Sequence, residues 1–111
     1  MTLTACSSTK LSFSEIENVP DYVAEVINPE NRLQSINDGK GSYIVFHSSG
    51  DVEANLETKG DTIIIKFDEA NLQGDAKPHT FYLTTSPEYD VLDVWVNGES
   101  IPFDNVTVKT K

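Results

Sequence analysis

Apolar and polar residues alternate with a period of two along residues 51–59, and this is the most regular pattern in the chain. The apolar positions are Val52, Ala54 and Leu56, and the residues between them are Glu53, Asn55 and Glu57. Such alternation is typical of a β-strand with one buried face and one wet face. The segment therefore predicts a strand at the surface of a sheet.

Two runs of β-branched and aromatic residues, Tyr43–Phe46 and Thr62–Phe67, flank this segment. Gly50 and Gly60 lie at the two breaks, where a tight reversal needs a residue that tolerates positive φ. The three segments together predict an antiparallel meander of three strands. In that register Ile63, Ile65 and Phe67 share the inward face with the apolar residues of 51–59.

Shorter segments with the same composition predict further strands on either side of the meander. They are Arg32–Asn37, His79–Thr85, Val91–Val96, Glu99–Phe103 and Asn105–Lys111. Asn97-Gly98 is the strongest two-residue hairpin signal in the chain, because both residues adopt the positive φ of a type I′ turn. The chain is thus expected to be mainly β, an antiparallel sandwich or partly open barrel of six to seven strands.

One short helix is expected near the N-terminus. Ser14 and Glu17 match a capping box, and a two-turn amphipathic helix is expected over Pro20–Ile27. Its apolar face comprises Tyr22, Val23, Val26 and Ile27. Asn28-Pro29 ends the helix, because the residue before a proline avoids the helical region. We expect this helix to pack on one face or end of the sheet.

Composition narrows the functional classes. The chain has 111 residues and fits one domain, 13–111, after a tether at 1–12. Its formal net charge of −10 repels phosphate backbones, so nucleic acid is an unlikely partner. One cysteine and two histidines exclude a thiolate-built zinc or iron–sulfur site. No cofactor is predicted, and the acidic loop at 68–75 does not match the spacing of a calcium-binding loop.

The single cysteine, Cys6, follows Leu3-Thr4-Ala5, which resembles the lipobox of a bacterial lipoprotein. The polar residues after it fit a flexible tether. Lipid on Cys6 would anchor the domain to the membrane, outside the cytoplasm, as the remnant of a precursor with a signal peptide. The alternative is a chance tetrapeptide with a free thiol in a cytoplasmic protein.

His47 and the two serines that follow it are the nearest approach to a nucleophile with a base. Adjacent residues of a strand point to opposite faces, so Ser49 and not Ser48 could pair with His47. The plainer interpretation is a half-buried histidine in a strand.

Trp95 falls on the opposite face of its predicted strand from Leu92, Val94 and Val96. It either lies beneath the helix or the long loop, or stays exposed as a binding anchor. Tyr82 and Tyr89 are candidate neighbours in an aromatic patch, and His47 is a further candidate for binding.

The lipobox, the serine-rich tether, Val19-Pro20-Asp21-Tyr22-Val23 and the run from Tyr43 to Gly50 together resemble small Bacillus-type envelope lipoproteins of Gram-positive cells. The resemblance implies secretion and membrane anchoring, and some such proteins are labelled peptidyl-prolyl isomerases. We therefore expect a non-enzymatic, lipid-anchored domain that binds a protein or small ligand at the cell envelope. The alternative is a prolyl isomerase or another minor extracytoplasmic enzyme, such as a hydrolase that uses His47.

Overall fold

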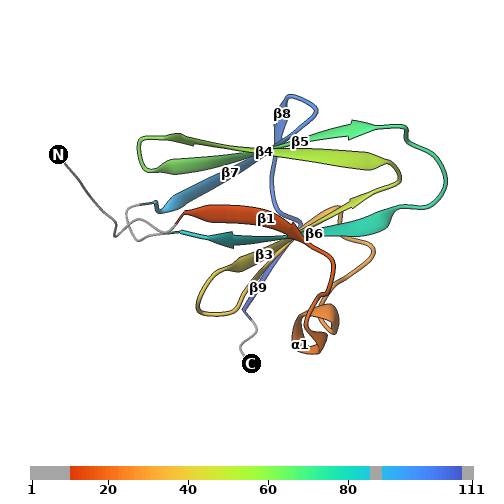
Figure 1. The fold of residues 1–111 in the computed structure, drawn as a ribbon, viewed down its shortest axis with the longest axis horizontal. Helices are drawn as coiled ribbons and strands as arrows, with labels where there is room; N and C mark the ends of the chain where they lie inside the picture. Colours follow the sequence, from red (N-terminus) through yellow and green to blue (C-terminus); the bar gives the residue numbers. More distant parts are fainter. Residues whose placement is uncertain (1–10, 86–88, 109–111) are drawn as a thin grey trace.

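The computed structural model describes residues 11–85 and 89–108, which form two β-sheets packed face to face (Figure 1). The five-stranded sheet has the order β1-β6-β3-β2-β9, and the four-stranded sheet has the order β4-β5-β7-β8. The strands are β1 (Ser12–Ile16), β2 (Leu33–Asn37), β3 (Ser42–Ser48), β4 (Asp51–Lys59), β5 (Thr62–Ala70), β6 (Lys77–Thr84), β7 (Val91–Val96), β8 (Glu99–Ile101) and β9 (Asn105–Val108).

The mainly β class is confirmed, but the expected strand count is wrong. The described residues contain nine strands instead of six to seven, and neither sheet closes into a barrel. Both sheets are mixed, because β9 pairs with β2 and β7 pairs with β5 in parallel. Parallel neighbours arise where the chain crosses between the sheets and returns, which a local sequence pattern does not reveal.

The predicted three-strand meander is only partly correct. β4 and β5 form the expected antiparallel hairpin, with Lys59 opposite Thr62 and a positive φ of 63° at Gly60. β3, however, belongs to the other sheet and pairs with β2 and β6. At Gly50 the chain passes between sheets instead of reversing within one. A Cβ there would lie 2.2 Å from the Ala70 carbonyl oxygen, so this glycine is needed for close approach.

The main core lies between the two sheets and contains the residues expected there. Ile63, Ile65 and Phe67 are buried, and the apolar residues of β4 pack against them. The facing sheet contributes the buried residues Leu33, Ile44, Phe46, Phe81 and Leu83. The rings of Phe46 and Phe67 stack across the interface with their centroids 4.9 Å apart.

The outer face of the five-stranded sheet carries a second, smaller core. The apolar residues expected for the helix face do pack here, against Ile36, Tyr43 and Val45. The two-turn N-terminal helix itself is not formed. Only α1 (Asp21–Ala24) is helical, a single turn that follows β1. The capping-box prediction is also wrong, because residues 12–16 pair with β6 as a strand.

Candidate functional site

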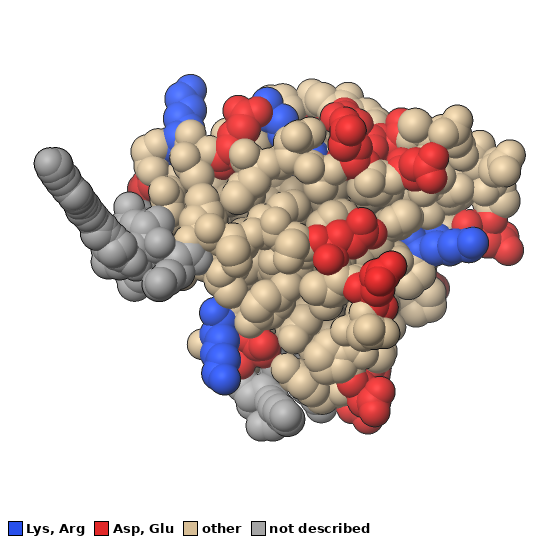
Figure 2. All heavy atoms as spheres, in the orientation of Figure 1, with Lys and Arg blue, Asp and Glu red and all other residues tan. Residues whose placement is uncertain are grey.

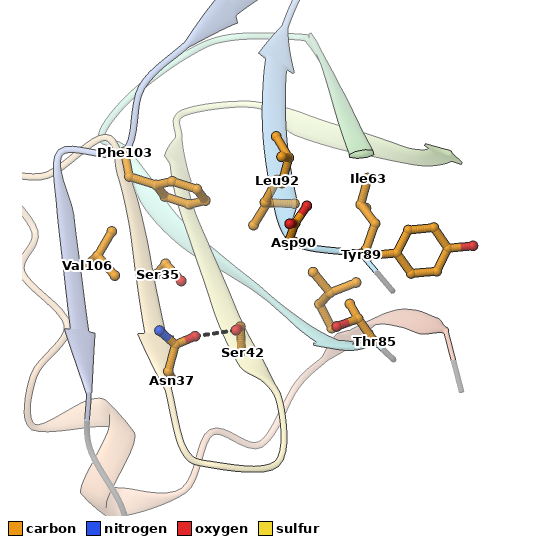
Figure 3. A pocket seen from close by; sticks show the side chains of 12 residues that line it. Ser35, Asn37, Ser42, Ile63, Thr85, Tyr89, Asp90, Leu92, Phe103 and Val106 are labelled. Atoms are coloured by element: carbon orange, nitrogen blue, oxygen red, sulfur yellow. Dashed lines mark hydrogen bonds between the residues drawn. The ribbon is translucent and has the colours of Figure 1, made fainter. Parts of the chain in front are cut away.

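The two sheets separate at one end and leave a cleft of about 380 Å³ between them (Figure 3). This end, called the open end below, is where β2 and β6 finish and where β3, β5 and β7 begin. The volume lies near the lower limit for small-molecule sites. The cleft is lined by residues from both sheets and from the segments that connect them.

The floor of the cleft is polar where an apolar core is expected. Ser35, Asn37 and Ser42 alternate with core residues of the second cluster, so their side chains face inward. Ser42 donates a hydrogen bond to the Asn37 side-chain oxygen. In the described structure, the Asn37 amide nitrogen and the hydroxyl of Ser35 have no hydrogen-bond partner, although Ser35 is only 4% exposed.

The facing walls of the cleft are apolar. Ile63, Leu92 and Phe103 line it from the side of the four-stranded sheet and the connection to β9 (Figure 3). Val91 and Val106, which also line the cleft, are 47% and 61% exposed, large values for valine side chains. An apolar wall opposite unpartnered polar groups gives the cleft an amphipathic lining.

Two aspartates lie at this end of the molecule, and a backbone hydrogen bond joins them. The backbone N–H of Asp90 donates to the Asp61 carbonyl oxygen at 3.2 Å, which joins the start of β7 to the β4–β5 turn. Asp90 also lines the cleft. Among the described residues, neither side chain takes part in an ion pair.

The opposite end, called the closed end below, is filled by a polar network around Glu69. One Glu69 carboxylate oxygen accepts from Ser48 at 2.7 Å, and the other accepts from Asn97 at 2.9 Å and from Arg32 at 3.2 Å. The Glu69 side chain is 8% exposed, whereas that of Arg32 is 52% exposed. The Arg32 guanidinium also lies 5.6 Å from the centre of the Phe46 ring.

The electrostatics of Glu69 follow from these contacts. Burial alone would raise the pKa of its carboxyl group, because the charged form loses solvation. The hydrogen bonds from Ser48 and Asn97, together with the Arg32 guanidinium, more than offset burial and hold the pKa of Glu69 below its ordinary value. Glu69 is therefore a structural anion and a poor general base.

His47 lies beside this network but is not connected to it. A hollow of about 400 Å³ is lined by His47, Ser48, Ser49 and Glu69, among others. His47 is buried, which lowers its pKa, and a backbone hydrogen bond to Asn31 only partly opposes this shift. Its Nδ1 atom has no hydrogen-bond partner among the described residues. Of the two serines that line this hollow, Ser48 is hydrogen-bonded to a carboxylate but is only 3% exposed, and it has no hydrogen bond to His47. The described residues of the hollow therefore form no nucleophile–histidine–carboxylate relay.

The three candidate aromatic residues lie in three different places. Trp95 is partly buried on the outer face of the four-stranded sheet, and its indole N–H donates to Asp93 at 2.8 Å. Neither α1 nor the loop at 71–76 supplies that contact. Tyr82 lies on the outer face of the other sheet, where its ring is tilted against that of Tyr43 with the centroids 4.6 Å apart and its hydroxyl donates to Asp38. Only Tyr89 lines the open cleft.

Sequence reasoning missed the polar residues at both ends. It placed Glu69 in a solvated loop, but β5 continues to Ala70. The signal was present, because Glu69 extends the inward series Ile63, Ile65 and Phe67 by one more alternate position. Period-two alternation from Leu33 likewise predicts that Ser35 and Asn37 point inward from their strand.

Comparison with known proteins does not identify the cleft or the Glu69 network as a known type of site. Comparison with protein-family models, with curated proteins and with solved structures finds no match. Within residues 11–85 and 89–108, no three His, Cys, Asp or Glu side chains gather as a metal site would require. No helix in this part of the chain is long and apolar enough to cross a membrane. Cys6 lies outside the described residues.

Proposed function

We propose that this chain is a non-enzymatic binding domain, held at the outside of a cell membrane by lipid on Cys6, that takes a small ligand into the cleft at its open end. The observation that carries the proposal is the cleft lining, in which Ser35 opens onto the cleft opposite apolar walls and its hydroxyl makes no hydrogen bond within the described residues. A ligand in the cleft can form that bond.

Binding fits the cleft better than catalysis does. Its polar groups are hydroxyls, an amide and the Asp90 carboxylate at the rim, and none of its lining residues is a histidine, lysine or cysteine. Apolar walls with a few placed polar groups are the usual composition of a ligand site.

Chemical-shift mapping of the full chain tests the proposal. A fragment mixture that contains neutral, cationic and anionic small aromatics should shift amide signals of β2, β5 and β7 at the open end. Ser35→Leu, which fills the cleft with an apolar side chain, should abolish the shifts while a thermal melt shows that the variant remains folded. If no fragment shifts these signals, the proposed binding site is wrong.

The membrane anchor is supported by the sequence Leu3-Thr4-Ala5-Cys6 and the polar residues that follow it. A thioether-linked diacylglycerol contributes about 0.8 kcal/mol of membrane affinity per buried CH₂. Expressed behind a lipoprotein signal segment in a Gram-positive host, the chain should fractionate with membranes. The Cys6→Ala variant should be found in the soluble or secreted fraction, and equal partitioning of the two would exclude the anchor.

A hydrolase that uses His47 is the alternative function, favoured by the hollow that His47 shares with Ser49 and Glu69. The isomerase activity implied by the resemblance has no such support in the described residues. Turnover of a panel of p-nitrophenyl esters, and of a proline-containing peptide, would establish an enzyme if His47→Ala removed it. Activity unchanged in His47→Ala would assign the turnover to a contaminant.

A further inference from the structure

The walls of the open cleft select the shape of its ligand. Leu92 and Phe103 on one side face the floor formed by β2 and β3 on the other (Figure 3). A cleft of about 380 Å³ between two sheets accommodates a compact, flat body. An aromatic or alicyclic ring fits such a space and gains from contact with apolar side chains.

The floor selects a polar group at the inner end of the ligand. The Asn37 amide nitrogen can only donate, whereas the Ser35 hydroxyl can donate or accept. Figure 3 shows both side chains directed toward the cleft. A ligand hydroxyl satisfies both, because it accepts from Asn37 and either donates to Ser35 or accepts from it.

The rim selects the charge of the ligand. Asp90 lines the cleft there and takes part in no ion pair among the described residues. Its backbone N–H donates to the Asp61 carbonyl oxygen, so the β4–β5 turn lies beside it. The chain has a net charge of −10, and acidic side chains outnumber basic ones on the face shown in Figure 2, mostly over its middle and right. An anionic ligand would be repelled at this rim, and a cation would be attracted.

We infer that the open cleft binds a small amphipathic amine: a ring between the sheets, a hydroxyl against Ser35 and Asn37, and an ammonium group at Asp90. The inference rests on the proposed function, since it names the ligand class of the same cleft. It adds that charge at the rim, and not apolar burial alone, decides which ligands bind.

Four probes that share one phenyl body separate these contributions. Tyramine carries both the hydroxyl and the amine, phenethylamine lacks the phenolic hydroxyl, tyrosol replaces the amine by an uncharged hydroxyl, and 3-(4-hydroxyphenyl)propanoate carries an anion instead. Titration of the full chain, followed by amide chemical shifts at low salt, gives a dissociation constant for each. Tyramine should bind tightest and the anion weakest.

The expected ratios follow from the groups removed. Tyramine should bind roughly fivefold more tightly than tyrosol, as expected for a partly exposed ion pair. It should bind about three- to tenfold more tightly than phenethylamine, because one hydrogen bond to the floor is lost. The Asp61→Asn/Asp90→Asn double variant should bind tyramine and tyrosol equally. Asp68→Asn/Asp75→Asn, which changes the net charge by the same amount away from the cleft, should keep the difference.

The outcomes separate this inference from the proposed function. If tyramine and tyrosol shift the cleft signals with equal affinity in the unmodified chain, the cation assignment is overturned and binding in the cleft stands. If the two double variants behave alike, the preference arises from net charge and the assignment to the rim is overturned. If none of the four probes shifts cleft signals, the inference is overturned, and the fragment mixture then decides the proposed function.

Discussion

Inward-facing polar side chains are hydrogen-bonded between the two sheets at the closed end of the sandwich but not at the open end. At the closed end, Ser48 and Glu69 come from different sheets and meet at 2.7 Å, and Arg32 and Asn97 complete the network. At the open end, Ser35 is buried to the same degree but faces an open cleft without a partner. The polar groups of the closed end therefore connect the two sheets, whereas the Ser42–Asn37 hydrogen bond of the open end stays within one sheet and Ser35 makes no bond to the other sheet.

The connections of the chain explain why the closed end is closed. β3 passes directly into β4 of the other sheet there, and Gly50 packs against the Ala70 backbone. At the open end, the β2–β3 and β4–β5 turns each return the chain within its own sheet, while the connection from β6 to β7 joins the two sheets. The two turns impose no close contact between the sheets, so the sheets can stand apart beside them.

The largest expected effect lies in the core that both ends share. Ile65 is fully buried at the middle of β5, so Ile65→Ala should cost about 2–5 kcal/mol of the free energy of unfolding. Glu57→Ala, on the wet face of the neighbouring strand, should cost under about 0.5 kcal/mol despite its contact with Lys66. Urea melts measure both, and equal losses would contradict the register of β4 and β5.

The network of the closed end should give the next largest effect. Glu69→Ala removes the shared acceptor of Ser48, Asn97 and Arg32, and should cost about 2–3 kcal/mol at neutral pH. Arg32 is half exposed and recovers hydration, which keeps the loss below that of a fully buried ion pair. Glu99→Ala, on the exposed strand β8, is the matched control and should cost little.

Low pH should reduce the stability that Glu69 contributes. The pKa of Glu69 is lower in the folded chain than the ordinary value of 4.5, so its contribution is present above that value and is lost as pH falls through the folded pKa. The difference in stability between the unmodified chain and Glu69→Gln should therefore shrink below about pH 4.5. A difference that grows in acid would contradict the lowered pKa.

The turn at Asn97-Gly98 links the hairpin of β7 and β8 to the closed end. Both residues have positive φ, 52° and 84°, as the type I′ prediction requires, and the Asn97 side chain contacts Glu69 twice. Gly98→Val should cost roughly 1–3 kcal/mol, because a β-branched residue strains this backbone. Gly98→Asn should cost far less, since asparagine tolerates the region. If urea melts show both variants to be equally harmless, the turn does not constrain the hairpin.

Local pattern was sufficient to predict the strand faces. The inward positions of β4, β5 and β7 and the turn at Asn97-Gly98 follow from period-two alternation and from the φ that each residue tolerates. β3 also carried a signal that was not used. Its unbroken apolar run from Tyr43 to Phe46 is typical of a strand covered on both faces, and α1 with its neighbours covers the second face.

Pairing and site composition could not be predicted from local pattern. Ser14 and Glu17 match a capping box, but the segment that begins with Ser12 forms β1 and pairs with β6 instead. Tertiary contacts override the weak preference of a short helix. Arg32 and Glu69 lie 37 positions apart and meet because β2 begins and β5 ends at the same side of the sandwich. Neither segment carries a local signal for that contact.

Two inward-facing serines provide the sharpest and smallest test of the difference between the ends. Ser48 and Ser35 are 3% and 4% exposed, and both lie in strands of the five-stranded sheet. Ser48→Ala removes a hydrogen bond to a carboxylate and should cost about 1.5 kcal/mol. Ser35→Ala removes a hydroxyl without a partner and should change stability by less than about 0.5 kcal/mol, in either direction. Urea melts at neutral pH measure both. Because the two substitutions delete the same atom from equally buried sites, a similar loss in both would mean that the Ser35 hydroxyl is already satisfied and is not free to bind a ligand.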